Sequence, residues 1–380
     1  MIFAMWFQED SLELKMRPSL LKSVLVFRLC LSTLLCATWG VLNADQSQNP
    51  SSQATKAPQD SQDKVLPTAI VDTHEWNICV SVPHLKDSYW ISVNYGIIER
   101  AAHRGIGILF KDAGGYPNLA HQIAQLNSCY EESVDAIIVA SVSVTGLDPT
   151  LEKISRNVPV ISVVNKINRR NVSARVGVAP SAIGALLGRY LAESHSPVEG
   201  SIKTVWLPGT QGSGWASQLY DGFQKAVLGT AIQVVRTSWG DSDRAIQRLL
   251  VQEALEEYPD IRYIIANPLA AEAAVSVVRR RGLIDKVKII STQTTHSIYQ
   301  AIKRGTILAA GADMPVLQGK LALDLAVCHL ESDVCAQDIS PLIEIISNKN
   351  LNSVDTRGLL PAPGYRVQYQ LNAGQPSLAP

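Results

Sequence analysis

Short hydrophobic runs alternate with segments of helical period from residue 76 onward. The first four runs begin at Ile78, Ile106, Ala136 and Pro159. Between the first two runs, residues 88–104 carry Val93, Ile97 and Ala101 at four-residue steps, which is the spacing of one helix face. A second helical segment is expected over residues 118–132. The pattern predicts the order strand, helix, strand, helix, strand in this part of the chain.

The same order returns after residue 201. Hydrophobic runs begin at Lys203, Ile232, Tyr263 and Lys288, and residues 216–227 and 244–257 between them have helical spacing. Strands that alternate with helices of this length predict a parallel sheet with helices on both faces. The chain is therefore predicted to form two doubly wound α/β lobes. Ligands of such sheets bind beyond the carboxyl ends of the strands, so a cleft between the lobes is the expected binding site.

The N-terminal segment has the features of a secretory signal. Residues 1–44 end in a hydrophobic run, with Arg17 and Lys22 before it and Ala44 after it. Arg28 interrupts the run, which is short for a membrane span, although an uncleaved signal anchor is the alternative. Acidic residues before Met16 do not suit a signal peptide, so Met16 is the hypothesised start. Residues 45–75 are expected to form a flexible leader.

Composition and motifs exclude several function classes. The chain has 34 Lys+Arg and 34 Asp+Glu residues, and this balance argues against nucleic-acid binding. It has no G-x-S-x-G elbow, and the loop 209–214 lacks the Gly-Lys-Ser/Thr ending of a phosphate-binding loop. The histidines are scattered and no C-x-x-C is present. We therefore expect no enzyme activity, no metal and no cofactor.

Four cysteines would remain after removal of the signal. They are Cys79, Cys129, Cys328 and Cys335, and they allow three complete pairings. Cys328 and Cys335 are seven positions apart, which makes a short disulfide loop feasible. Cys79 is expected as a buried strand residue and Cys129 as a residue near a helix end.

Large aromatic side chains gather where the predicted strands end. They are Tyr89, Trp90, Tyr116, Trp215 and Trp239, in a chain with only 6% aromatic residues. One interpretation is that they cover the hydrophobic cores at the rims of the lobes. The other is a cage of aromatic faces, which binds methylated ammonium groups by cation–π attraction.

Several loop segments resemble one group of proteins. Residues 85–96 are similar to the first loop and helix of the periplasmic sensors of trimethylamine N-oxide (TMAO) respiration, which have the fold of type I periplasmic binding proteins. Further similar stretches are residues 113–116, 175–178, 188–191, 240–243, 270–274, 296–299, 303–305 and 318–319. The resemblance covers residues 76–369. It implies a non-catalytic periplasmic protein that reports TMAO or a related small methylated oxide to a membrane sensor histidine kinase.

The resemblance also implies site residues. Asp87, Tyr89, Trp90 and Tyr116 match ligand-site positions of the family. Two further aromatic positions of the family's cage fall near Pro180 and Gln293, neither of which carries an aromatic ring. This departure admits a related N-oxide, an S-oxide or another methylated amine as the ligand. Asp313 is added because it lies where the chain recrosses between the lobes in the wider superfamily.

The resemblance sets the expected domains. The N-lobe is expected at 76–165, completed by 313–340, and the C-lobe at 166–312, completed by 341–370. The alternative function is the binding protein of an ABC importer for a sugar or small polar nutrient. Asp87, Asn267 and Asp313 would then supply hydrogen bonds to hydroxyl groups.

Overall fold

The computed structural model describes residues 75–196, 200–241, 243–332 and 334–374. The expected signal segment 1–44, the hypothesised start at Met16 and all of the expected leader except Glu75 lie outside these residues. In the described ranges, no helix is both long and apolar enough to cross a membrane.

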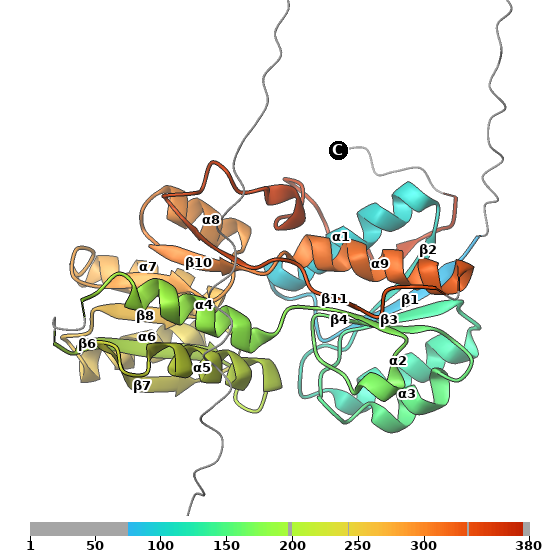
Figure 1. Ribbon diagram of the computed structural model, residues 1–380, viewed down its shortest axis with the longest axis horizontal. Coiled ribbons are helices and arrows are strands. Elements are labelled where there is room, and N and C mark those ends of the chain that lie inside the picture. The colour runs from blue at the N-terminus through green and yellow to red at the C-terminus, as the bar shows by residue number, and fades with distance from the viewer. Residues whose placement is uncertain (1–74, 197–199, 242, 333, 375–380) are drawn as a thin grey trace, which may run out of the picture. The chain divides into compact units, whose positions relative to one another are not determined.

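The first sheet contains seven strands in the order β11-β5-β4-β3-β1-β2-β13, and only β13 runs antiparallel to its neighbour. Helices α1 and α9 cover one face, and α2 and α3 cover the other (Figure 1). We call this sheet with its four helices the N-lobe. Its elements are β1 (Asn77–Val82), α1 (Ser88–Arg104), β2 (Gly107–Asp112), α2 (Leu119–Glu131), β3 (Ala136–Val139), α3 (Asp148–Ile154), β4 (Val160–Val163), η1 (Arg169–Asn171), β5 (Ala174–Val176), α9 (Pro315–Glu331), β11 (Asp338–Ile339) and β13 (Gln370–Leu371).

The second sheet contains six strands in the order β12-β10-β9-β8-β6-β7, with β12 antiparallel to β10. Helices α4 and α5 pack in one apolar cluster on this sheet, and α6, α7 and α8 pack in another. We call this sheet with its helices the C-lobe. Its elements are α4 (Pro180–Ala192), β6 (Ile202–Gly209), α5 (Gly214–Val227), β7 (Ile232–Trp239), α6 (Arg244–Glu257), β8 (Tyr263–Ala266), α7 (Pro268–Arg280), β9 (Lys288–Ser291), α8 (His296–Lys303), β10 (Ala309–Ala312), β12 (Glu344–Ser347) and η2 (Thr356–Gly358).

Short strands and capped helices explain why this sequence forms these layers. The inner strands β3, β4 and β8 are buried along their whole length, as expected for parallel strands covered on both faces. Helix α1 begins where the Asp87 carboxylate accepts a hydrogen bond from the backbone N–H of Trp90, at 3.0 Å. It ends at Gly105, whose φ of 72° lies in the left-handed region that glycine adopts most readily. The two doubly wound lobes agree with the fold that the sequence predicts.

The strand pairings place the lobe boundaries differently from the sequence analysis. Strand β5 pairs with β4, so the first sheet continues beyond residue 165, where the N-lobe was expected to end. Strand β13 pairs with β2, so the end of the segment 341–370 returns to the first sheet. Both strands are short, and this is why the hydrophobic pattern did not reveal them. The chain crosses between the sheets after β5, after β10, after β11 and before β13.

Two disulfides join the four described cysteines. Cys328 pairs with Cys335, which is the short loop that the sequence made feasible. Cys79 on β1 pairs with Cys129 on α2, and both side chains are fully buried. These two residues lie on a strand and near a helix end, as the sequence predicts. The sequence does not predict that they pair, because the packing of α2 against β1 decides which cysteines meet.

Candidate functional site

A cavity of about 90 Å³ is lined by residues from both lobes, beyond the carboxyl ends of their strands. A cavity of roughly 150 Å³ holds a benzene molecule, so this one has room for a ligand of a few heavy atoms. All seven residues that the resemblance implied contribute to the lining: Asp87, Tyr89, Trp90, Tyr116, Pro180, Gln293 and Asp313. The structure therefore brings together side chains that are separated by more than half of the chain.

The first turn of α1 supplies the aromatic wall of the N-lobe. The Asp87 cap holds this turn, and Tyr89 and Trp90 follow the cap directly. Their rings meet edge to face, with centroids 5.7 Å apart. His84 packs its ring edgewise against Trp90 and Tyr116, at 6.3 and 5.7 Å between centroids. The four rings form one contiguous cluster beyond the carboxyl ends of β1 and β2.

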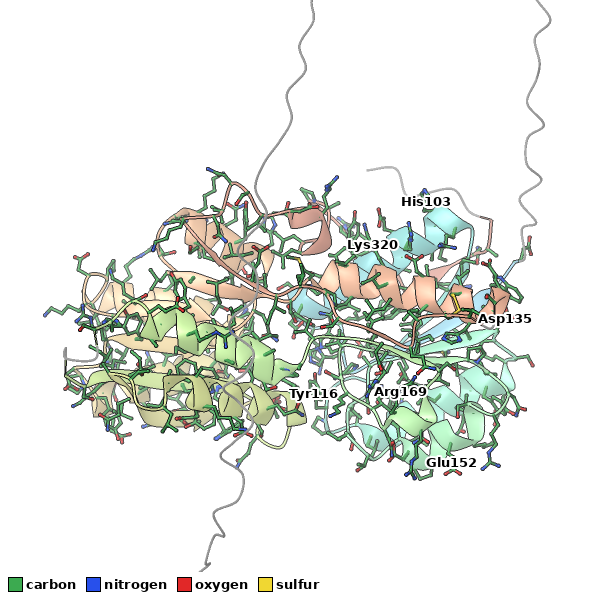
Figure 2. All side chains as sticks on the ribbon, viewed as in Figure 1. His103, Tyr116, Asp135, Glu152, Arg169 and Lys320 are labelled. Carbon is green, nitrogen blue, oxygen red and sulfur yellow. A yellow bond between two sulfur atoms is a disulfide. The ribbon has the colours of Figure 1, made fainter. Side chains whose placement is uncertain are left out.

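Tyr116 reaches this cluster from the loop after β2 and is labelled in Figure 2. Asn165 donates hydrogen bonds to the Tyr116 hydroxyl at 3.3 Å and to the Ser141 carbonyl at 2.8 Å. Val164, just before Asn165, has a φ of 61°, which is strained for a β-branched residue. Burial raises the pKa of the Tyr116 hydroxyl, which therefore stays protonated at neutral pH.

Asp313 lies between β10 and α9 and is only 4% exposed. The Tyr89 hydroxyl donates to its Oδ2 at 2.7 Å, and Gln318 Nε2 donates to its backbone carbonyl at 2.6 Å. Burial raises the pKa of the Asp313 carboxyl to about 6, although the hydrogen bond from Tyr89 opposes this shift. Asp313 thus ties the end of a C-lobe strand to a helix of the N-lobe.

Asp87 is the second carboxylate of the aromatic wall. Burial raises the pKa of its carboxyl, while His84 and the backbone N–H groups of Trp90 and Tyr89 act in the opposite direction. His84 Nε2 lies 3.9 Å from Asp87 Oδ2. Over the part of the chain that the structure describes, His, Cys, Asp and Glu side chains form no group that could hold a metal ion.

The C-lobe side of the cavity is mainly apolar. Pro180 is the first residue of α4, and Gln293 lies in the loop after β9. Thr292 Oγ1 donates to Gln293 Oε1 at 3.3 Å, and this contact positions the amide. Trp215, at the start of α5, adds an aromatic ring to this side. Val178, Ile183 and Leu219 complete the apolar surface.

Eight polar or aromatic lining residues were absent from the site that the resemblance implies. They are His84, Ser88, Asn165, Trp215, Asn267, Glu272, Thr295 and Gln318. Trp215 and Asn267 follow strand ends, and the sequence suggests both for other reasons: Trp215 as an aromatic residue of a possible cage, and Asn267 as a hydrogen-bonding group for a sugar. Gln318 belongs to the similar stretch 318–319, and it joins the site because α9 packs on α1. Trp239, which is the last residue of β7, does not line the cavity.

Close helix packing positions the C-lobe side of the cavity. A Cβ atom on Gly184 of α4 would lie 1.9 Å from the Leu219 carbonyl oxygen of α5. In the opposite direction, a Cβ on Gly222 of α5 would lie 2.0 Å from the Ser181 carbonyl oxygen. The two helices therefore touch backbone to backbone. Their first turns carry Pro180 and Trp215 into the cavity.

We expect Gly184→Ala to lower the free energy of unfolding by about 2 kcal/mol. The added methyl group overpacks the helix contact, which destabilises the fold by about 1–3 kcal/mol or more. The higher helix propensity of alanine offsets about 1 kcal/mol of this loss. Chemical denaturation of the two proteins measures the difference. Ser181→Ala is the matched control, because its side chain is exposed on the same helix, and it should change stability by less than about 0.5 kcal/mol. Equal stability of Gly184→Ala and the parent protein would contradict the close contact.

Comparisons with known proteins agree with this architecture. Residues 78–333 match the model of the periplasmic binding protein domain. The periplasmic protein TorT of Escherichia coli O157:H7 is 36% identical over 77% of this chain and 84% of its own length.

The fold of this protein is also similar to solved structures. TorT in complex with the TorS sensor domain, in the presence of TMAO, matches 77% of this chain and 99% of that chain, with a TM-score of 0.71 and 31% identity. An ABC transporter solute binding protein from Bradyrhizobium sp. BTAi1, with bound bis-tris, matches 78% of this chain and 89% of that chain, with a TM-score of 0.71 and 36% identity. Because the likeness covers most of each chain, this protein belongs to the periplasmic binding proteins and, among them, to the TorT family.

Proposed function

We propose that this protein is a non-catalytic periplasmic sensor. It binds TMAO or a related small methylated oxide or amine in the cavity between its lobes, and it regulates the periplasmic domain of a membrane sensor histidine kinase. The observation that carries the proposal is the group of aromatic rings around a small cavity: Tyr89, Trp90, Tyr116 and Trp215. TorT, the similar protein, has been crystallised with the TorS sensor domain in the presence of TMAO.

The lining suits a ligand with methyl groups on a positively charged nitrogen. Each aromatic face attracts such a group by about 0.5–2 kcal/mol. The hydroxyl of Tyr116 and the indole N–H groups of Trp90 and Trp215 are donors for an oxide oxygen, which only accepts hydrogen bonds. Trp215 supplies a ring on the side where Pro180 and Gln293 supply none.

The alternative, a binding protein for a sugar, is less well supported, because two of the polar groups expected to bind it already form hydrogen bonds within the protein. Asn267 caps α7 by accepting from Ala270 N at 3.1 Å, and its amide donates to Leu207 O and Gln247 Oε1. Asp87 caps α1. Fewer groups therefore remain for the hydroxyls of a sugar than the sequence suggested.

The partner proposal has its own test. We expect the mature protein to co-elute with the periplasmic domain of its cognate histidine kinase, and deletion of the gene to abolish ligand-dependent kinase signalling. Intact signalling together with loss of growth on a nutrient would instead favour an importer component.

Gln293→Tyr tests the missing ring of the cage. If the amide simply replaces an aromatic face, the tyrosine should strengthen TMAO binding by about 2- to 30-fold in titration calorimetry. Gln300→Tyr, on α8 and outside the cavity lining, is the matched control and should leave the affinity unchanged. Weaker TMAO binding by Gln293→Tyr would show that the Gln293 amide contacts a different ligand.

A further inference from the structure

Four buried polar atoms on residues of the cavity wall have no partner among the described residues. They are the nitrogens Nδ1 of His84 and Nε1 of Trp215 and the oxygens Oδ1 of Asp313 and Oε1 of Gln318, and the two oxygens are acceptors. Asp313 and Gln318 are 4% and 1% exposed. Buried acceptors are costly when unpaired, so native proteins nearly always supply a donor. At a ligand cavity, that donor is expected on the ligand.

The neighbouring contacts fix which atoms remain unpaired. Gln318 Nε2 donates to the Asp313 carbonyl at 2.6 Å, so the amide cannot be turned over without placing two oxygens against each other. The same nitrogen lies 3.5 Å from the Tyr89 hydroxyl. Tyr89 in turn donates to Asp313 Oδ2, which leaves Oδ1 unsatisfied. Contacts that do not depend on the ligand therefore leave both acceptors without a partner.

The charges around the cavity point to a cation. Asp87, Glu272 and Asp313 line it, and no lysine or arginine does. Glu272 is paired with Arg244 at 3.2 Å and with Ser297, and Asp87 lies beside His84. Among the described residues, Asp313 has no ion pair. It is therefore the carboxylate that lacks a positive partner.

We propose that this site prefers a small methylated ammonium ion whose N–H group donates to Asp313 Oδ1, the unpaired oxygen of the carboxylate that has no ion pair, while the methyl groups face the aromatic rings. This inference rests on the proposed function and narrows its ligand class. The oxygen of TMAO can accept a hydrogen bond from the unpaired Nε1 of Trp215, but TMAO carries no donor. It therefore leaves both oxygens unpaired and Asp313 without a cation. Trimethylammonium has the same three methyl groups and supplies the missing proton and the positive charge.

Titration calorimetry with three probes tests the inference at pH 7.5. We expect trimethylammonium to bind about 10- to 150-fold more tightly than tetramethylammonium, which has the charge but no N–H. TMAO should also bind more weakly than trimethylammonium. Equal binding of trimethylammonium and tetramethylammonium, or tighter binding of TMAO, would overturn the inference and leave the proposed function standing. If none of the three binds, the proposed function fails as well.

Asp313→Asn gives a second readout that a purely structural role would not produce. The amide keeps an oxygen for Tyr89 and turns an N–H₂ donor toward the oxygen of TMAO. We expect trimethylammonium binding to fall by about 10- to 150-fold, while TMAO binding holds or improves. A parallel loss of both ligands would contradict the assignment. Asp285→Asn, exposed and outside the lining, is the matched control.

The pH dependence has opposite signs for the two ligands. Because burial raises the pKa of Asp313 to about 6, this carboxyl gains a proton as the pH falls through that value. Trimethylammonium binding should then weaken. TMAO can accept a hydrogen bond from the protonated carboxyl group of Asp313, so TMAO should bind more tightly. Tyr89, Tyr116, Asp87, Glu272 and His84 also face the cavity, and Asp313→Asn removes only the part that is due to Asp313. Tighter trimethylammonium binding at pH 5 than at pH 7.5 would contradict a carboxylate acceptor.

Discussion

Trp90→Ala is expected to weaken binding of the preferred probe, trimethylammonium or TMAO, by about 100-fold or more. The side chain is only 3% exposed and lies in the first turn of α1, between the rings of Tyr89 and His84. Its removal takes away an aromatic face, worth about 0.5–2 kcal/mol for a methylated cation, together with the apolar contact area of a large ring. It also removes an indole N–H donor at the cavity wall.

Three variants separate the contributions of Trp90. Trp90→Phe keeps an aromatic face and loses the N–H, so we expect a loss of about 10-fold or less for a ligand without an oxide oxygen. Trp239→Ala is the matched control, because Trp239 is also a tryptophan at the end of a strand, as the last residue of β7, and does not line the cavity. Calorimetry measures affinity, and thermal unfolding without ligand shows whether each variant is folded. A folded Trp90→Ala protein with unchanged affinity would show that the ligand binds elsewhere.

The fold was predictable because its determinants are local. The strands of both lobes are short runs of buried apolar residues, and the helices between them have an apolar stripe. Each signal lies within a few residues of chain. Strand β5 was missed for the converse reason. Its residues Ala174–Val176 are too few to form a pattern, and they become a strand through pairing with β4 and β11.

The candidate site was predictable where it follows a strand end and not where it depends on packing. Asp87, Tyr89 and Trp90 lie in one loop and helix start, so a single similar segment placed all three. Gln318 meets the Tyr89 hydroxyl across 229 positions of sequence, because α9 packs against α1. No feature of the sequence near Gln318 predicts that contact. The unpaired oxygens of Asp313 and Gln318 could not be predicted from the sequence, because they depend on the three-dimensional positions of these side chains.

The disulfide between Cys79 and Cys129 has the same long-range origin. It joins β1, in the middle of the first sheet, to α2 on the face of that sheet. Both sulfurs lie in an apolar cluster that also contains Leu126, Ile137 and Leu151. The bond closes a segment of 50 positions, whereas Cys328–Cys335 closes only seven. A crosslink restricts the unfolded chain more when the closed segment is longer.

We therefore expect unequal losses when each bridge is removed. Replacing Cys79 and Cys129 by alanine should lower the free energy of unfolding by about 4 kcal/mol, against about 2 kcal/mol for the same change at Cys328 and Cys335. Chemical denaturation of both double variants measures the two losses, and each variant serves as the control for the other. The parent protein, unfolded without reductant, should show no reactive thiol at these four positions. Four reactive thiols would show that neither bridge forms, and equal losses would show that segment length does not determine their contributions.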